Sequence, residues 1–293
     1  MSIQIHQIYI NYRLLCIFLI IIVTSCSNKS SGIVPDTAKV EPVKKQNPTL
    51  SHKKGACITT NKDGWSSKVS SLNVYWHYSW GVDLNKAEPD SVRFVPMIWG
   101  KWSLDKSLLK VDSLARIGKV NHLLGFNEPD GKEQANLTVE ESLAYWPQLM
   151  KLNIPLGSPA CIHADNAWMK EFMAKVAEKG FRVDFICVHW YGGANAQSLI
   201  DHLKSIHDLY QRPIWLTEFA PADWSALSPA TGKVTVAQAL AFMQQILPAL
   251  EKLDYVERYS WYSSSPDNAA LGNSALFDNA GYLTLLGEYY SKF

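Results

Sequence analysis

Two glutamates, Glu128 and Glu218, each stand where an apolar stretch of the chain ends. A carboxylate in such a place is costly unless it is paired or hydrogen-bonded. Either glutamate alone could cap a helix or form a salt bridge. Together they could perform acid–base and nucleophilic chemistry, because cleavage of a glycosidic bond uses two carboxyl groups. One group protonates the departing oxygen, while the other stays ionised and attacks or stabilises the anomeric carbon.

The elements that must position these glutamates follow from the pattern of apolar segments after Lys54. Short apolar stretches alternate there with helical patterns, and runs such as residues 185–188 are apolar throughout. Such runs are typical of parallel strands that are covered on both faces. The sequence predicts strands at Gly55–Thr59, Leu72–Tyr78, Arg93–Ile98, His122–Asn127, Ile154–Ser158, Val183–His189, Ile214–Glu218 and Val256–Tyr262.

Helix signals lie between the predicted strands. Thr138 and Glu141 form a capping-box pattern, and Asn166 and Thr235 precede further stretches with helical periodicity. Two prolines inside helical patterns, Pro147 and Pro248, predict kinks or breaks. Eight strands with intervening helices indicate an α/β fold, a single TIM-type (β/α)₈ barrel. An open doubly wound sheet is the alternative, but it lacks a glycine-rich phosphate loop.

A barrel of this kind would bring the two glutamates together. Catalytic groups in TIM barrels lie at the carboxyl ends of the strands. Glu128 follows the fourth predicted strand and Glu218 ends the seventh, so their side chains are expected to converge at the barrel mouth. The distance between them, which distinguishes retaining from inverting chemistry, does not follow from the sequence.

Composition narrows the choice of partners. The 293 residues are 47% apolar and 19% charged, with a formal net charge of +1. No basic footprint of a nucleic-acid-binding protein is present, and a near-neutral surface suits a neutral substrate. We expect neither a cofactor nor a metal ion, because His163 and Asp165 lack a third spaced ligand. A monomer is expected.

The N-terminus has the pattern of a lipoprotein signal. Arg13 precedes the apolar run 14–23, and Thr24 and Ser25 lie directly before Cys26. We therefore divide the chain into a signal peptide (1–25), a lipidated Cys26 with a flexible tether (26–53) and a barrel (54–293). Ser27 rather than aspartate after Cys26 favours an exported bacterial lipoprotein anchored to the outer membrane. It would face the periplasm or the surface and contact the membrane only through its lipid. An ordinary signal anchor is the alternative.

Three cysteines remain in the predicted barrel: Cys57, Cys161 and Cys187. An odd number gives no complete disulfide framework, and the spacing matches no zinc site. Small buried apolar side chains are the expectation, and one bridge between Cys161 and Cys187 stays open.

Longer strings around the glutamates resemble one family. The strings are residues 94–100, 124–130 (Leu-Gly-Phe-Asn-Glu-Pro-Asp), 184–192, 214–219 (Ile-Trp-Leu-Thr-Glu-Phe) and 258–262. They are similar to glycoside hydrolase family 128, the Asl1-like glycosyl hydrolase catalytic core, which belongs to the retaining (β/α)₈ clan. The resemblance spans Lys54 to Phe293 and implies β-1,3-glucan hydrolysis. One departure is Tyr78-Ser79-Trp80, where Tyr-Asn-Trp is expected, which affects one sugar contact.

The resemblance also implies roles. Glu218 would be the nucleophile and Glu128 the acid/base, with His189 and Tyr191 in the pocket. Tyr191 could orient Glu218, and Asn127 could bind a sugar 2-hydroxyl. Sugar rings stack on aromatic faces, and the substrate-binding aromatic residues are expected to be Tyr78, Trp80, Trp99 and Trp261, with Trp261 the best candidate.

The leading hypothesis is a retaining endo-β-1,3-glucanase that works by double displacement. Two alternatives stay open: a glycan-binding lipoprotein without turnover, and a hydrolase of a different polysaccharide.

Overall fold

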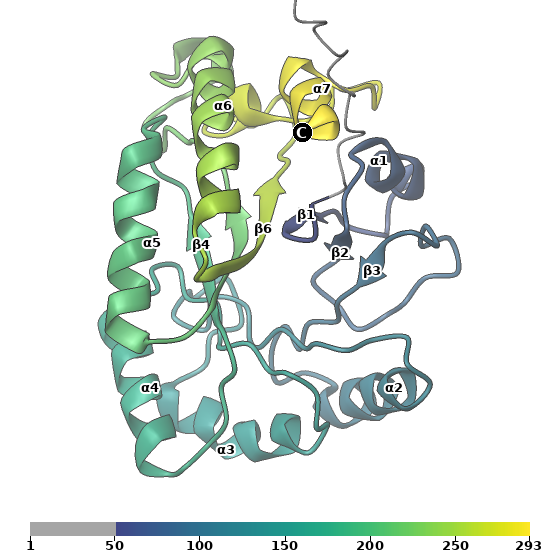
Figure 1. Ribbon diagram of the computed structural model, residues 1–293, viewed down its shortest axis with the longest axis vertical. Helices are drawn as coiled ribbons and strands as arrows, with labels where there is room; N and C mark the ends of the chain where they lie inside the picture. Colours follow the sequence, from purple (N-terminus) through teal and green to yellow (C-terminus); the bar gives the residue numbers. More distant parts are fainter. Residues whose placement is uncertain (1–50) are drawn as a thin grey trace, which may run out of the picture. The chain divides into compact units, whose positions relative to one another are not determined.

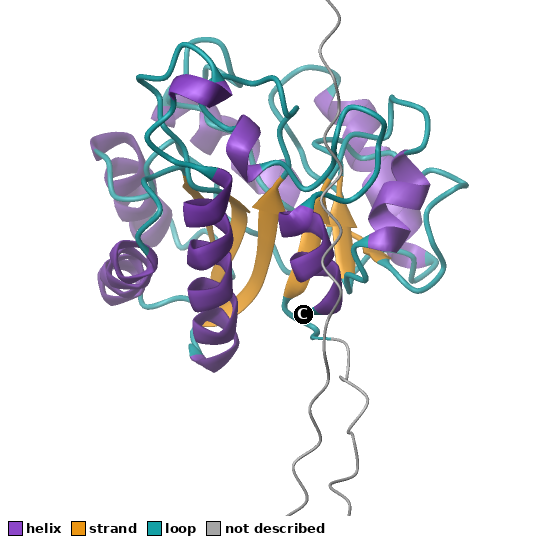
Figure 2. Ribbon diagram, turned by 90° about the horizontal axis from the view of Figure 1, so that it is seen from above, coloured by secondary structure: helices purple, strands orange, loops and turns teal. Residues whose placement is uncertain are grey.

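Parallel strands form the centre of the fold, and helices surround them (Figures 1 and 2). The structure is a computed structural model and describes residues 51–293. Its strands are β1 (Lys54–Cys57), β2 (Trp76–Tyr78), β3 (Arg93–Phe94), β4 (Ile186–Trp190), β5 (Ile214–Phe219) and β6 (Val256–Tyr262). They pair in the order β3-β2-β1-β6-β5-β4, always in parallel. The predicted signal peptide, Cys26 and most of the tether lie outside the described residues.

Two further segments join β3 to β4 and close the ring. Single parallel bridges connect Met97 to Leu124, Leu123 to Leu156, Asn127 to Ala160 and Gly157 to Phe185. The predicted strands 122–127 and 154–158 therefore occupy their places in the barrel as isolated bridges rather than continuous strands. Pro96, Pro155 and Pro159 explain the interruption, because proline has no amide hydrogen to donate to a neighbouring strand.

The second predicted strand begins too early. Leu72 caps the C-terminus of α1 (Trp65–Ser71), and pairing starts only at Trp76. Leu72 and Val74 are apolar because they are buried in the core, not because they belong to a strand. The prediction for β6 is confirmed at both ends.

The other helices are α2 (Leu104–Arg116), α3 (Val139–Met150), α4 (Ala167–Glu178), α5 (Ala196–Tyr210), α6 (Val236–Lys252) and α7 (Leu285–Lys292). The predicted capping box at Thr138 and the predicted helix starts after Asn166 and Thr235 are confirmed, and each of these side chains accepts a hydrogen bond from a backbone amide of its helix. Of the kinks or breaks predicted at Pro147 and Pro248, the breaks are wrong, because α3 and α6 continue through both prolines. Buried side chains before and after each proline hold both helices to the barrel.

The core has two parts. A large outer part fills the space between strands and helices, and a smaller one includes Tyr78, Met97, Phe185 and Trp215. Cys57, Cys161 and Cys187 are all free and buried, so the expectation of small core side chains is confirmed and no Cys161–Cys187 bridge forms. Among the described residues, no helix is long and apolar enough to cross a membrane.

Candidate active site

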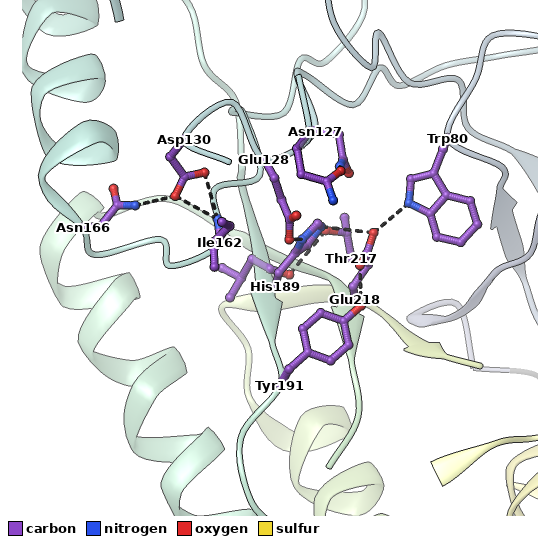
Figure 3. Close-up of polar contacts among 12 residues, drawn as sticks. Trp80, Asn127, Glu128, Asp130, Ile162, Asn166, His189, Tyr191, Thr217 and Glu218 are labelled. Atoms are coloured by element: carbon purple, nitrogen blue, oxygen red, sulfur yellow. Dashed lines mark hydrogen bonds and ion pairs between the residues drawn. The ribbon is translucent and has the colours of Figure 1, made fainter. Parts of the chain in front are cut away.

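Glu218 lies near the end of β5 and receives hydrogen bonds from three side chains (Figure 3). The Trp80 indole donates to Oε1 at 2.7 Å, and the Tyr78 hydroxyl lies 3.1 Å from the same oxygen. The Tyr191 hydroxyl donates to Oε2. The residue is only 5% exposed, so these donors replace water around a carboxylate that the barrel has buried.

Both phenols stay protonated. Burial, and then the negative charge of Glu218, raise the pKa of Tyr78 and of Tyr191 well above its usual value. Each hydroxyl therefore remains a donor, and an ionised carboxylate is the acceptor that suits three donors at once. This environment fits a group that must carry negative charge in the resting site.

Glu128 lies in a strained turn on the opposite side of the site. Its backbone adopts a φ of +40°, a left-handed conformation that non-glycine residues rarely take. Two backbone hydrogen bonds hold it there: its amide donates to Ala160 O at 2.7 Å, and its carbonyl accepts from Gly131 N at 2.9 Å. The Glu128 side chain is 15% exposed and that of Glu218 is 7% exposed, so Glu128 is the more accessible of the two. Strain maintained at such a point is a recognised mark of a functional residue.

His189 connects the two carboxylates. Its Nδ1 lies 3.0 Å from Glu128 Oε1, and its Nε2 lies 3.4 Å from Glu218 Oε1 (Figure 3). A register shift between Val188 and His189 places the ring opposite Glu218 on the neighbouring strand, and such bulges are common beside active sites. Burial alone would lower the pKa of His189, but the charges of Glu218 and Glu128 and the hydrogen bond to Glu128 outweigh it, so the pKa is raised. One imidazole ring thus spans the gap between the two acids.

Asn127 is oriented by a residue that the sequence did not suggest. Its Nδ2 donates to Gln134 Oε1 at 3.2 Å. Its Oδ1 is buried, and within residues 51–293 it has no hydrogen-bond partner. Gln134 lies on a loop without periodic pattern, so nothing in the sequence marked it.

The aromatic predictions have mixed outcomes. Trp261 is 1% exposed, and its indole donates to Ser274 O, so its prediction as a sugar platform is wrong. Successive strand residues face opposite sides, and the next residue, Tyr262, lies beside Trp80 instead, with 6.0 Å between the ring centroids. Tyr78 is fully buried, so its predicted direct contact with substrate is also wrong, and it bonds Glu218.

Exposed tryptophans flank the site. Trp99 is half-buried and packs against Trp102, which is 58% exposed. Trp224 is 67% exposed, and its indole donates to Tyr191 O at 3.1 Å. Trp224 follows β5 in an irregular loop, where sequence periodicity gives no signal.

Hydrogen bonds to Asp130 hold the residues that follow segment 156–160 in place. Asp130 accepts hydrogen bonds from Ile162 N and Asn166 Nδ2, while Asn166 Oδ1 caps α4 (Figure 3). Asp130 therefore ties the turn that carries Glu128 to the start of α4.

Known proteins share this architecture. A family model described as the glycosyl hydrolase catalytic core matches residues 55–290. This chain belongs to that family. A relative, alkali-sensitive linkage protein 1 of Schizosaccharomyces pombe, is 30% identical over 252 residues. The match covers 83% of this chain but 45% of that protein, so the chain spans less than half of its relative.

Solved structures of GH128 enzymes are also similar to this chain. A GH128 subgroup I endo-β-1,3-glucanase from Amycolatopsis mediterranei, in complex with laminarihexaose, is 33% identical with a TM-score of 0.71. The match covers 82% of this chain and 99% of that one. A subgroup II endo-β-1,3-glucanase from Pseudomonas viridiflava is 27% identical with a TM-score of 0.67, over 83% and 98% of the two chains. The predicted membership of GH128 is confirmed, and the chain is a glycoside hydrolase.

Proposed function

We propose that this glycoside hydrolase is a retaining endo-β-1,3-glucanase. The observation that carries the proposal is the single imidazole of His189, which contacts Glu128 on one nitrogen and Glu218 on the other. Two carboxyl groups held this way face one small space, as cleavage of a glycosidic bond by a carboxyl pair requires. Similarity to the Amycolatopsis and Pseudomonas endo-β-1,3-glucanases supports the linkage.

The proposed reaction has two steps. Glu218 attacks the anomeric carbon while Glu128 gives its proton to the departing oxygen, which breaks the glycosidic bond and leaves a glycosyl–Glu218 ester. Glu128, now ionised, then takes a proton from water as the water oxygen attacks the same carbon. This releases Glu218 and returns the proton to Glu128.

Neighbouring residues support each step. Hydrogen bonds from Trp80 and Tyr191 orient the attacking carboxylate. Oδ1 of Asn127, which has no hydrogen-bond partner in the described part of the chain, can accept a hydrogen bond from the sugar 2-hydroxyl, a contact that strengthens in the transition state. Trp80 and Trp99 are half-buried and could present their faces to sugar rings.

Laminarin hydrolysis by Glu128→Gln and Glu218→Gln tests the assignment. We expect each variant to lose about 10²- to 10⁴-fold or more in kcat. Glu133→Gln, an exposed glutamate in the neighbouring loop, is the matched control and should keep full activity. Proton NMR of the first products should show the β-anomer. Full activity of either active-site variant would refute the assignment.

The same assays separate the alternatives. Laminarin binding without release of reducing ends by the unaltered protein would indicate a glycan-binding protein. Release of reducing ends from another polysaccharide, but not from laminarin, would identify a different substrate. Sizing the products distinguishes endo from exo cleavage.

We also propose, from the sequence before residue 54, an outer-membrane lipoprotein attached through Cys26. Mass spectrometry of the purified chain should find a diacylglyceryl thioether on Cys26. A Cys26→Ala variant that stays in the membrane fraction would contradict it.

A further inference from the structure

Two hollows adjoin beside the active site. The inner hollow, of about 370 Å³, is lined by Trp80 and Tyr262, whose rings lie next to each other near Glu218. The outer hollow, of about 700 Å³, lies between α1, the turn 279–283 and α7. Figure 1 shows α1 and α7 on the same side of the barrel. Three residues line both hollows: Asp63, Lys68 and Asn279. The hollows therefore border one another at these residues, and together we call them the α1 groove.

The turn that borders the groove is firmly built. Phe277 pairs with Leu283 in an antiparallel bridge, and Asp278 Oδ1 accepts hydrogen bonds of 2.9 Å from the amides of Ala280 and Tyr282. This turn presents the Tyr282 side chain, 73% exposed, at the outer end of the groove. An exposed aromatic ring on a fixed backbone costs little entropy when a ligand stacks on it.

Lys68 lies where the two hollows meet. Its ammonium lies 5.2 Å from the centre of the Phe277 ring, and its stem passes Gly281, which has a φ of +88°. Within residues 51–293 no carboxylate lies within ion-pair distance of this ammonium. Its three donors are therefore available to hydroxyl groups in the groove.

The chemistry of the lining fits a neutral polyhydroxy ligand. The inner hollow contains two lysines and two aspartates, Lys62, Lys68, Asp63 and Asp278, so opposite charges are equal in number. Hydroxyl groups of Thr59 and of residues 263–265 add donors and acceptors. A charged polymer would meet repulsion from half of these groups, whereas sugar hydroxyls can bond to all of them.

We propose that the α1 groove binds distal glucosyl residues of a long β-1,3-glucan chain, on the non-reducing side of the bond that is cleaved. This inference rests on the proposed function. The side follows from chemistry: Glu128 protonates the departing sugar, whereas the groove begins at Trp80 beside the attacking Glu218. Tyr282 stacks on a sugar face, and Lys68 donates to hydroxyls. The enzyme should therefore favour long chains over short ones.

Chain-length dependence tests the groove. We would measure kcat/KM on laminarin and on laminaritetraose for Tyr282→Ala and Lys68→Met. Leu109→Ala, which changes an equally exposed residue on α2, is the control. Loss of a stacking contact should lower kcat/KM on laminarin about threefold to tenfold, mainly through KM. On laminaritetraose each variant should stay within about twofold of the unaltered enzyme, and the control should change neither value.

Equal losses on both substrates, or no loss on laminarin, would overturn the proposal. If the unaltered enzyme cleaves neither substrate, the proposed function fails, but the groove is still tested by calorimetric binding of laminarin to the full chain. Weaker binding by Tyr282→Ala than by Leu109→Ala would support the groove, and equal binding would overturn it.

Discussion

At the scale of single residues, the attacking carboxylate is held by donors from separate parts of the barrel. Tyr78 ends β2, Trp80 follows it, and Tyr191 follows β4, yet all three contact Glu218. A carboxylate with fixed donors on both oxygens does not need to reorient before it attacks. The arrangement also has a cost, since removing one donor leaves part of a buried charge without a partner.

The first prediction concerns that cost. Tyr191→Phe removes the donor to Glu218 Oε2 and should lower kcat about 10- to 100-fold, because a hydrogen bond to a charged group contributes about 1.5–3 kcal/mol. Tyr262→Phe is the matched control. Its ring centroid lies 5.5 Å from that of Tyr191, and no hydrogen bond of its hydroxyl is found within residues 51–293. Steady-state kinetics on laminarin would decide, and equal effects of the two changes would contradict this role for Tyr191.

At the scale of elements, the two acids are positioned differently. Glu218 lies within β5, next to a register shift in its pairing, whereas Glu128 lies in a left-handed turn beyond segment 122–127. Such a turn needs support from outside its own strand. Asp130 provides it, because its carboxylate accepts from Ile162 N at 3.1 Å and from Asn166 Nδ2 at 2.7 Å. The start of α4 therefore helps to fix the proton donor.

The second prediction follows from this support. Asp130→Ala should lower kcat about tenfold and change KM little, because the turn would then sample positions in which Glu128 misses the departing oxygen. The control is Asp165→Ala, which removes an exposed aspartate from the turn that precedes α4. Asp165 forms no hydrogen bond that is found among the described residues, so this change should leave kcat unchanged. Initial rates over a range of laminarin concentrations separate kcat from KM. A purely structural role would instead lower the yield of folded enzyme and leave the kcat of the folded fraction unaltered.

Elements also show how far the sequence could predict the site. Glu128 and Glu218 were predictable because each interrupts an apolar run, and a barrel brings such ends together. Trp261 was predicted as the sugar platform, but its neighbour Tyr262 is the residue that lies beside Trp80. The alternation of strand residues places the two on opposite faces of β6, but it does not show which face points to the barrel mouth. Gln134 had no periodic signal at all, since its contact with Asn127 depends on the path of a loop.

At the scale of the whole molecule, the two ends of the barrel unit hold each other. Lys54 in β1 is 1% exposed, and its Nζ donates to Tyr290 O in α7 at 2.8 Å. Burial, opposed by the charge of Glu251, lowers the pKa of Lys54 to about 8. In return, the Tyr290 hydroxyl donates to Gly55 O at 2.7 Å. Closure of the ring between β1 and β6 therefore depends on α7, the last helix in the sequence.

The last prediction tests that closure. Tyr290→Phe leaves the buried Gly55 carbonyl without this donor and should lower the free energy of unfolding by about 1–3 kcal/mol. Tyr289→Phe changes the neighbouring tyrosine of the same helix, which is only half-buried, and should change stability by less than about 0.5 kcal/mol. Urea unfolding of both variants gives the comparison, with equal m-values as the check that the same surface unfolds. Below the transition, laminarin hydrolysis should be equal in both variants, because Tyr290 lies at the start of β1, whereas the carboxylates lie at the opposite ends of the strands. Equal stability of the two variants would mean that β1 is held by its neighbouring strands alone.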